Sequence, residues 1–308
     1  MQRLFPFRQG DRAEYLAQYI LSAIAITVPV PRQEDVGTDF HCSLLERDGD
    51  NLRPSLPFNI QIKSHGKNVL KKGFRFGGST EKGAPKPHEI KQLCQTDTPF
   101  LVGLVRLKKQ TLDLFTTVTR YFILNNWPVE GKTQSPQIVA LMPYSPPGET
   151  EINAGVFDDN EKLWTLHLGQ PIVSISIAAS ENQNACEKIK KTLRPYLEMD
   201  QENGVLSRIR LGYFRWPLRI QTGGPLKRTF GVALSAPTSP GTILDSQRRV
   251  MARFVASLLA TYRALNKRKE ILQWEHIPEQ LLFDQEPQFV RDTIDKAIEF
   301  AKSTDTGP

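Results

Sequence analysis

Residues 38–65, TDFHCSLLERDGDNLRPSLPFNIQIKSH, decide the fold, because they hold two alternating stretches on either side of a turn. Alternation runs from about residue 38 to 45 and again from 58 to 65. One face of each stretch is apolar: Phe40, Cys42 and Leu44 in the first, and Phe58, Ile60 and Ile62 in the second. A period of two predicts strands. The run Asp48-Gly49-Asp50-Asn51 between them is a strong turn signal.

The polar faces of these two strands carry the residues of chemical interest. The first presents Asp39, His41 and Ser43, and the second presents Asn59, Gln61, Lys63 and His65. An antiparallel pair centred on residue 50 places Asp39 opposite Gln61. We therefore expect Asp39, Gln61 and Lys63 on one face, directed away from the core.

A helix is predicted before the strands, over residues 11–26, with Asp11 as its N-cap. Its apolar face recurs at helical spacing and is formed by Ala13, Leu16, Ala17, Ile20, Leu21 and Ile24. Glu14 lies at the edge of that face, so it can reach the same end of the sheet. Pro29 and Pro31 then favour extended chain.

The rest of the chain predicts further helices and strands. A basic, glycine-rich loop (71–78) precedes a short helix (87–95) and a hairpin of strands 100–107 and 112–124 around Lys108-Lys109-Gln110. After a proline-rich, less regular stretch (128–147) we expect strands 164–168, 172–177 and 213–222 and helices 182–200, 244–270 and 287–302.

Length and composition indicate a globular chain with two domains. It has 308 residues, 39% of them hydrophobic and 24% charged. We expect a first domain at 1–125 and a C-terminal α+β region at 126–308 for substrate binding or oligomerisation. An apolar signal peptide and a membrane-length apolar run are both missing, which indicates a cytoplasmic, bacterial protein. Cys42, Cys94 and Cys186 suit neither disulfides nor zinc, so we expect packed thiols.

Basic residues are concentrated in one part of the chain. Of a net charge of +7, the stretch from Lys63 to Lys91 contributes eight basic against two acidic residues. This predicts a polyanionic partner, with a solvated lysine-rich loop as the alternative. Lys67, Lys71, Lys72 and Arg75 would follow a phosphate backbone. Phe74 and Phe76 would stack on bases or pack onto the sheet.

The polar set suits phosphodiester hydrolysis. Carboxylates of Glu14 and Asp39, the Gln61 amide oxygen and the backbone carbonyl of Ile62 are the hard oxygen ligands that Mg²⁺ or Mn²⁺ prefers. Lys63 would position the attacking water or neutralise charge on the phosphate. The alternative is that Glu14 is a solvated helix acid and Asp39 a turn residue at the start of a strand. Gln61 and Lys63 would then belong to the solvated face of an edge strand. His41 shares the face of Asp39 and either assists there or is simply hydrogen-bonded.

Three stretches together resemble the PD-(D/E)XK nuclease superfamily in its Gln-x-Lys variant, as in Mrr-type restriction endonucleases. They are Arg8-Gln9-Gly10-Asp11-Arg12-Ala13-Glu14, Asp35-Val36-Gly37-Thr38-Asp39-Phe40 and Gln61-Ile62-Lys63-Ser64. They are also similar to an uncharacterised bacterial domain family associated with mobile elements and anti-phage defence. The resemblance covers about residues 8–125.

The resemblance implies an α/β fold with a restriction-endonuclease-like core, in which a mixed sheet is flanked by helices. It implies that Asp39 is the principal metal ligand, Gln61 a supporting ligand, Lys63 the catalytic lysine and Glu14 the helix acid. Gln61 stands where the family motif has an acid, which removes one charge from the site.

The expected function is therefore a metal-dependent nuclease acting on nucleic acid, in particular DNA, in anti-phage defence. The alternatives are a catalytically inactive nuclease-like module that binds nucleic acid or recruits a partner, and an interaction protein that uses its C-terminal half. A homo-oligomer or a defence-system partner protein would fit either alternative.

The predicted helix 244–270 carries two features that bear on partners. Its basic residues, which would extend a nucleic-acid surface or form a solvated face, are Arg248, Arg249, Arg253, Arg263, Lys267, Arg268 and Lys269. Its apolar stripe, which would be core or an oligomer seam, is Val250, Met251, Phe254, Val255, Leu258, Leu259 and Tyr262.

Overall fold

A computed structural model describes most of the chain, and it separates into two compact units. The described residues are 4–31, 37–49, 51–78, 89–90, 93–94, 96, 98–121, 137–144, 155–158, 160–208, 213–215, 229–231, 240–275 and 286–303. The first unit comprises Met1–Leu124 and Thr133–Val205, and the second Asn125–Lys132 and Leu206–Pro308. The first unit thus continues well beyond residue 125, the end that the sequence predicts for the first domain.

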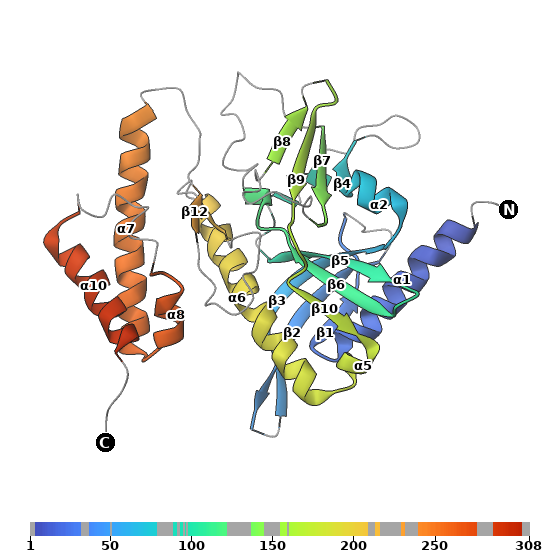
Figure 1. Ribbon diagram of the computed structural model, residues 1–308, viewed down its shortest axis with the longest axis horizontal. Coiled ribbons are helices and arrows are strands. Elements are labelled where there is room, and N and C mark those ends of the chain that lie inside the picture. Colours follow the sequence, from blue (N-terminus) through green and yellow to red (C-terminus); the bar gives the residue numbers. More distant parts are fainter. Residues whose placement is uncertain are drawn as a thin grey trace. The chain divides into compact units, whose positions relative to one another are not determined.

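A six-stranded mixed sheet forms the centre of the first unit (Figure 1). Its strands, in spatial order, are β1 (Ala25–Pro29), β2 (Phe40–Asp48), β3 (Asn51–Ser64), β5 (Phe100–Arg106), β6 (Thr111–Thr116) and β10 (Val173–Ser176). Only β3 and β5 are parallel; the other neighbouring strands are antiparallel. The prediction of an α/β fold with a mixed sheet flanked by helices is confirmed at this level.

The hairpin of β2 and β3 has the predicted register. Phe40 lies opposite Ile60, as predicted. An irregularity between Ser43 and Leu45 shifts the pairing by one residue towards the turn, where Asp48 pairs with Asn51. Gly49 in that turn has φ +62°, which glycine adopts without strain. Prolines within β3 are tolerated because they precede Asn59, where pairing with β5 starts.

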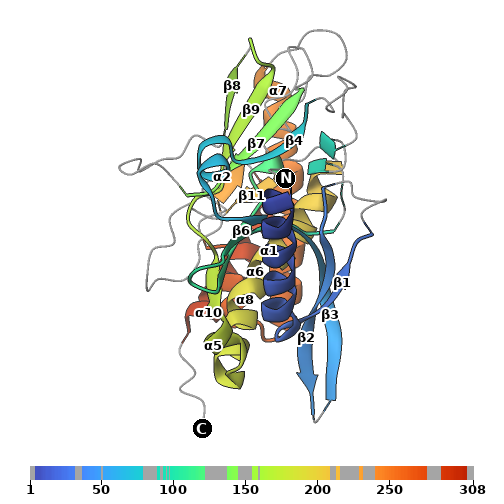
Figure 2. The same cartoon turned by 90° about the vertical axis from the view of Figure 1, so that its right-hand side faces the viewer.

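The first helix covers the apolar side of this hairpin. α1 (Leu4–Ser22) packs against β3 and β5, and Ala17, Ile20 and Leu21 are fully buried. Figure 2 shows α1 in front of the sheet, beside β3. The prediction of residues 11–26 is wrong at both ends. The helix begins before Asp11, so Asp11 is not its cap. Residues 25–29 form β1 instead, because β-branched side chains there pair with β2.

A second, four-stranded sheet follows the order β4 (Phe74–Gly77), β7 (Ile138–Met142), β9 (Leu163–His167) and β8 (Gly155–Asp158). The expected basic loop at 71–78 is therefore wrong. Lys67–Lys72 form helix α2 and Phe74–Gly77 pair with β7, because Phe74 and Phe76 bury completely against the fold. The less regular stretch 128–147 likewise contains a strand, β7.

Two further predictions need correction in the first unit. The strand predicted over 112–124 ends at Thr116, and residues 120–121 are helical. The helix predicted over 182–200 is longer: α6 spans Gln183–Arg208 and follows the short α5 (Ile177–Ser180). Of the helix predicted over 87–95, residues 89–90 and 93–94 are helical, and the others lie outside the described residues.

The second unit is mostly helical in its described part. It contains a small hairpin of β11 (Tyr213–Arg215) and β12 (Thr229–Gly231) and the helices α7 (Pro240–Ala264), α8 (Arg268–Leu272) and α10 (Gln288–Lys302). The single helix predicted over 244–270 is wrong, since Asn266 has φ +54° and separates α7 from α8. Of the strand predicted over 213–222, only residues 213–215 are described.

The apolar stripe of α7 forms core. Met251, Val255 and Leu259 are fully buried, whereas Val250 and Phe254 are exposed. α7 packs against α10, whose Val290 and Ile294 are also buried. In the described part of the chain, no helix is both long enough and apolar enough to span a bilayer.

Candidate active site

Asp39 is joined to the Gln-x-Lys strand by its own carboxylate. Its Oδ2 accepts a hydrogen bond from the backbone amide of Ile62 at 2.5 Å, and its backbone amide donates to the carbonyl of Ile60 at 2.9 Å. Because β2 begins only at Phe40, the Ile62 amide on β3 donates to the side chain of Asp39 and not to a backbone carbonyl of β2. The carboxylate is thus fixed beside the motif.

The carbonyl of Ile62 is directed to the same side. In an extended strand the N–H and C=O of one residue point to the same neighbour. The N–H of Ile62 points to the Asp39 carboxylate, so the Ile62 carbonyl also faces the space beside Asp39. This arrangement agrees with the expected role of the Ile62 backbone as an oxygen donor.

Gln61 is buried and incompletely satisfied. Its side chain is 6% exposed, and its Oε1 has no hydrogen-bond partner among the described residues. A buried acceptor without a partner carries a desolvation cost, so a bound ligand at this atom would recover it. Gln61 is also the position where the sequence motif lacks an acid.

Gly37 explains how the chain passes close to Gln61. It has φ +91°, and a Cβ there would lie 3.3 Å from the ring of Phe76 and 3.7 Å from Nε2 of Gln61. Glycine is favoured because both the backbone angle and the space exclude a side chain. Phe76 in turn packs edge-on against Phe100 of β5, with ring centroids 6.0 Å apart.

Lys63 lies two residues beyond Gln61 on β3, and alternation places both on one face. Its side chain is exposed, in contrast to the buried Gln61. The same face of β1 and β2 is open to solvent: Val28 is 53% exposed, and His41 is exposed and hydrogen-bonded to Asn59 at 2.7 Å. A polymer can therefore approach this side of the sheet.

Glu14 is related to the site region by the packing of its helix against β3. It is half-buried, next to the fully buried Ala13, on the helix that packs against β3. The structure thus joins Asp39 directly to Ile62, the residue that follows Gln61. It links Glu14 to them at the level of elements.

The donor set fits a hard divalent cation. It consists of the Asp39 carboxylate, the Gln61 Oε1 that has no partner among the described residues, and the Ile62 carbonyl, all oxygen atoms. Oxygen-only sets of this type suit Mg²⁺ or Mn²⁺. Within the described ranges, no group of three or more His, Cys, Asp and Glu side chains has metal-binding geometry. The fit therefore depends on the amide and the backbone oxygen.

The expected phosphate-tracking residues follow this strand. Lys71 and Lys72 on α2 and Arg75 on β4 are exposed, and the side chain of Lys67 lies outside the described residues. Phe74 and Phe76 are 0% and 1% exposed. They pack into the fold, so the option that they stack on bases is wrong.

A hydrogen-bonded polar cluster around the buried Asp113, on the same face, was missed by sequence reasoning. It consists of Asp113, Arg106, Tyr144 and Ser174. Of these residues, Asp113 is the one that the sequence could have indicated, because it interrupts the apolar run Leu112–Phe115. In the structure Asp113 is 2% exposed. Its partners Arg106 and Ser174 lie on β5 and β10, and Tyr144 follows the end of β7, so no local pattern connects them.

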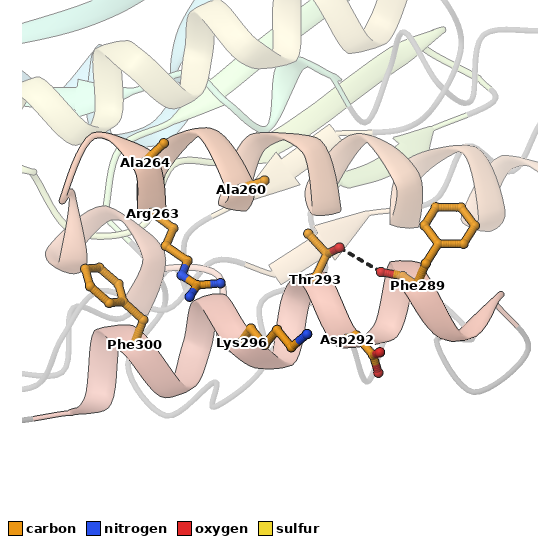
Figure 3. A pocket seen from close by; sticks show the side chains of 8 residues that line it. All are labelled: Ala260, Arg263, Ala264, Phe289, Asp292, Thr293, Lys296 and Phe300. Carbon is orange, nitrogen blue, oxygen red and sulfur yellow. Dashed lines mark hydrogen bonds between the residues drawn. The ribbon is translucent and has the colours of Figure 1, made fainter.

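The second unit has a groove of its own between α7 and α10 (Figure 3). Its volume is about 590 Å³, and its sides carry Arg263 from α7 and Phe289, Lys296 and Phe300 from α10. Of the basic residues predicted on α7, Arg253 pairs with buried Glu286 at 3.3 Å. Arg248 lies at a position whose side chain is outside the described residues.

Comparison with protein-family models, with curated proteins and with solved structures finds no match to this chain.

Proposed function

We propose that the protein is a metal-dependent nuclease that hydrolyses phosphodiester bonds. The observation that carries the proposal is the hydrogen bond from the Ile62 amide to Asp39, which joins a carboxylate to the residue that follows Gln61, whose buried amide oxygen has no hydrogen-bond partner among the described residues. Exposed Lys63 shares the face of Gln61. A phosphodiester is an anion, so a cation site next to a free ammonium group suits it.

The chain's own residues would divide the work. Asp39, Gln61, the Ile62 carbonyl and Glu14 would hold Mg²⁺ or Mn²⁺. Such an ion, when bound, polarises a phosphoryl oxygen and lowers the pKa of bound water. Lys63 would orient the attacking water and offset negative charge on the phosphate. Lys71, Lys72 and Arg75 would contact neighbouring phosphates without reading sequence.

Element order supports a PD-(D/E)XK-type core. The chain runs through helix α1 with Glu14, then β1, the hairpin with Asp39 and Gln61-Ile62-Lys63, α2 and β4, helical residues at 89–90 and 93–94, and β5 parallel to β3. The expected elements occur in the expected sequence, with β1, α2 and β4 in addition. DNA as the substrate and a role in anti-phage defence rest on the resemblance alone.

The test is cleavage by the full-length protein. Plasmid, linear duplex and single-stranded DNA, and RNA, are incubated with Mg²⁺, with Mn²⁺ and with chelator. Metal-dependent cutting that disappears in Asp39→Asn and Lys63→Ala supports the proposal. Asp48→Asn, an exposed acid at the hairpin turn paired with Arg53, is the matched control and should cut normally.

A second function is favoured by one observation, the neutral residue at position 61. Fewer ligand charges weaken metal binding. A module that binds nucleic acid without cutting it would show salt-sensitive affinity and no metal-dependent products. A protein with no nucleic-acid affinity at moderate salt would instead be an interaction protein, and both nucleic-acid functions would fail.

A further inference from the structure

We propose that Arg106 binds a substrate phosphate next to Lys63, and that Asp113 and Tyr144 are its positioning residues. The inference rests on the proposed function, in that nucleic acid must lie on this face of the sheet. It adds a specific contact from β5 that no sequence motif indicated.

Strand register places Arg106 on the candidate site's face. Lys63 lies opposite Leu104 on the parallel strand β5, and Arg106 is two residues further along β5. Residues two apart share a face, so Lys63, Leu104 and Arg106 project from the same side. His65, exposed, follows the end of β3 at the level of Arg106. The C-terminal ends of two adjacent parallel strands thus carry three basic side chains.

The guanidinium group of Arg106 is held by two partners. Its Nε donates to Oδ2 of Asp113 at 2.8 Å, and its Nη2 donates to the hydroxyl of Tyr144 at 2.5 Å. The Tyr144 hydroxyl donates to the same Asp113 oxygen at 2.5 Å. Ser174 donates to the other oxygen, Oδ1, at 2.6 Å. The carboxylate therefore accepts three hydrogen bonds and cannot rotate freely.

The tyrosine is itself constrained. Tyr144 has φ +62°, a conformation that few residues other than glycine adopt. Its ring packs edge-on against Phe115 at 5.2 Å, and the Arg106 guanidinium lies 5.5 Å from the ring centroid. Backbone strain of this type persists where the surrounding contacts over-determine it, and functional sites are a common location.

Donors remain available on the solvent side of Arg106. An arginine has five N–H donors, and the described hydrogen bonds use one on Nε and one on Nη2. The Arg106 side chain is 30% exposed, while that of Asp113 is 3% exposed. One edge of the guanidinium is thus buried against its partners and the other is accessible. An oriented fork of N–H groups is suited to bidentate phosphate binding.

The experiment measures DNA affinity of the full-length protein without metal, so that cleavage does not interfere. A fluorescent 20-base-pair duplex is titrated at several salt concentrations for the wild type, Arg106→Gln, Arg106→Lys and Tyr144→Phe. Arg53→Gln, an exposed arginine in an ion pair at the hairpin turn, is the matched control.

We expect Arg106→Gln to weaken binding about 10-fold and to reduce the slope of log K against log salt by about one. Arg106→Lys should keep the slope and lose part of the affinity, because it keeps the charge without the fork. Tyr144→Phe should cause a smaller loss, and Arg53→Gln none.

Unchanged affinity and slope in a folded Arg106→Gln protein would overturn the inference, as would a wild type that does not bind DNA. If Arg106→Gln does not fold, undiminished affinity in Arg106→Lys and Tyr144→Phe overturns it. If the wild type cleaves DNA with metal but its DNA affinity does not depend on Arg106, the nuclease proposal still stands and this inference fails. If DNA binding depends on Arg106 but no metal supports cleavage, this inference still stands and the nuclease proposal fails.

Discussion

The carboxylate of Asp39 accepts a hydrogen bond from the backbone amide of Ile62 at 2.5 Å, across two adjacent strands. The contact joins the residue before β2 to the middle of the Gln-Ile-Lys motif on β3. It makes the acid and the motif one rigid group, since the β2–β3 ladder holds both chains in register. We therefore expect substitutions at these positions to leave the rest of the fold unchanged. Their effects on the free energy of unfolding and on metal binding can then be measured separately.

Gln61 provides the sharpest test of the metal site. Gln61→Glu places a carboxylate at a 6% exposed position beside Asp39, so without metal the protein should be less stable by about 1–3 kcal/mol. Added Mn²⁺ should raise its melting temperature more than it raises that of the wild type, because ion binding stabilises the folded state. Thermal unfolding with and without Mn²⁺ measures both effects.

The companion variant is Gln61→Leu. It removes the unpartnered acceptor, so its stability without metal should be close to that of the wild type, while its response to Mn²⁺ should be smaller. An equal response to Mn²⁺ in all three proteins would show that position 61 is not a ligand.

Substitution of Lys63 should lower the cleavage rate with little change in the stability of the protein. Its side chain is exposed, so Lys63→Ala should change the free energy of unfolding by no more than about 0.5 kcal/mol. The cleavage rate should fall at least about 100-fold, since the substitution removes a charge that stabilises the transition state. Initial rates on plasmid DNA measure this. Lys71→Ala, another exposed lysine, is the control and should weaken binding without a comparable loss of rate at saturating DNA.

The buried ion pair of Arg120 and Asp200 should dominate the stability of the first unit. Arg120 is 0% and Asp200 2% exposed, and Asp200 also accepts from the Phe100 amide at 2.8 Å. Asp200→Ala would leave a buried guanidinium unpaired, at a cost of about 3–5 kcal/mol. Urea unfolding followed by circular dichroism measures it.

The solvent-exposed pair of Asp48 and Arg53 supplies the comparison. Asp48→Ala should cost no more than about 1 kcal/mol, because surface pairs are screened. Similar losses for the two alanine variants would contradict the assignment of Asp200 as a buried structural partner.

The three cysteines should be unreactive in the folded protein. All are free and buried, and burial raises the pKa of the Cys42 and Cys94 thiols to about 12. The thiolate is the reactive species, so at pH 8 a thiol reagent such as Ellman's reagent should react slowly. Denaturant should expose all three thiols to rapid reaction. Rapid reaction of Cys42 or Cys94 in the native protein would contradict this packing.

The hairpin shows how far sequence reasoning reaches. Alternation around Asp48-Gly49-Asp50-Asn51 predicted both the strands and the pairing that the structure contains, with Phe40 opposite Ile60. It succeeded because each strand has one buried face, and a slip of one residue would turn that face to solvent. The burial of Phe40, Cys42, Phe58 and Ile60 follows from the same pattern.

The errors lie where tertiary contacts override local preference. Residues 25–26 continue an apolar helical pattern, yet they extend because β2 offers a pairing edge. The glycine-rich stretch 71–78 resembled a loop, yet Phe74 and Phe76 bury and pair with a strand more than sixty residues away in the chain. Pairing partners so distant leave no signature in a local window.

The sequence by itself determined the register of the β2–β3 hairpin at Phe40 and Ile60 and the shared face of Gln61 and Lys63, because both depend on a period of two. It also determined the chemical types of the donor atoms, because these depend on side-chain identity. Tertiary structure alone decided that the Asp39 carboxylate meets the Ile62 amide, that Gln61 is buried, and that Arg106, Asp113, Tyr144 and Ser174 meet. Those contacts join residues that are distant in the sequence, and their distances are set by packing of the whole unit.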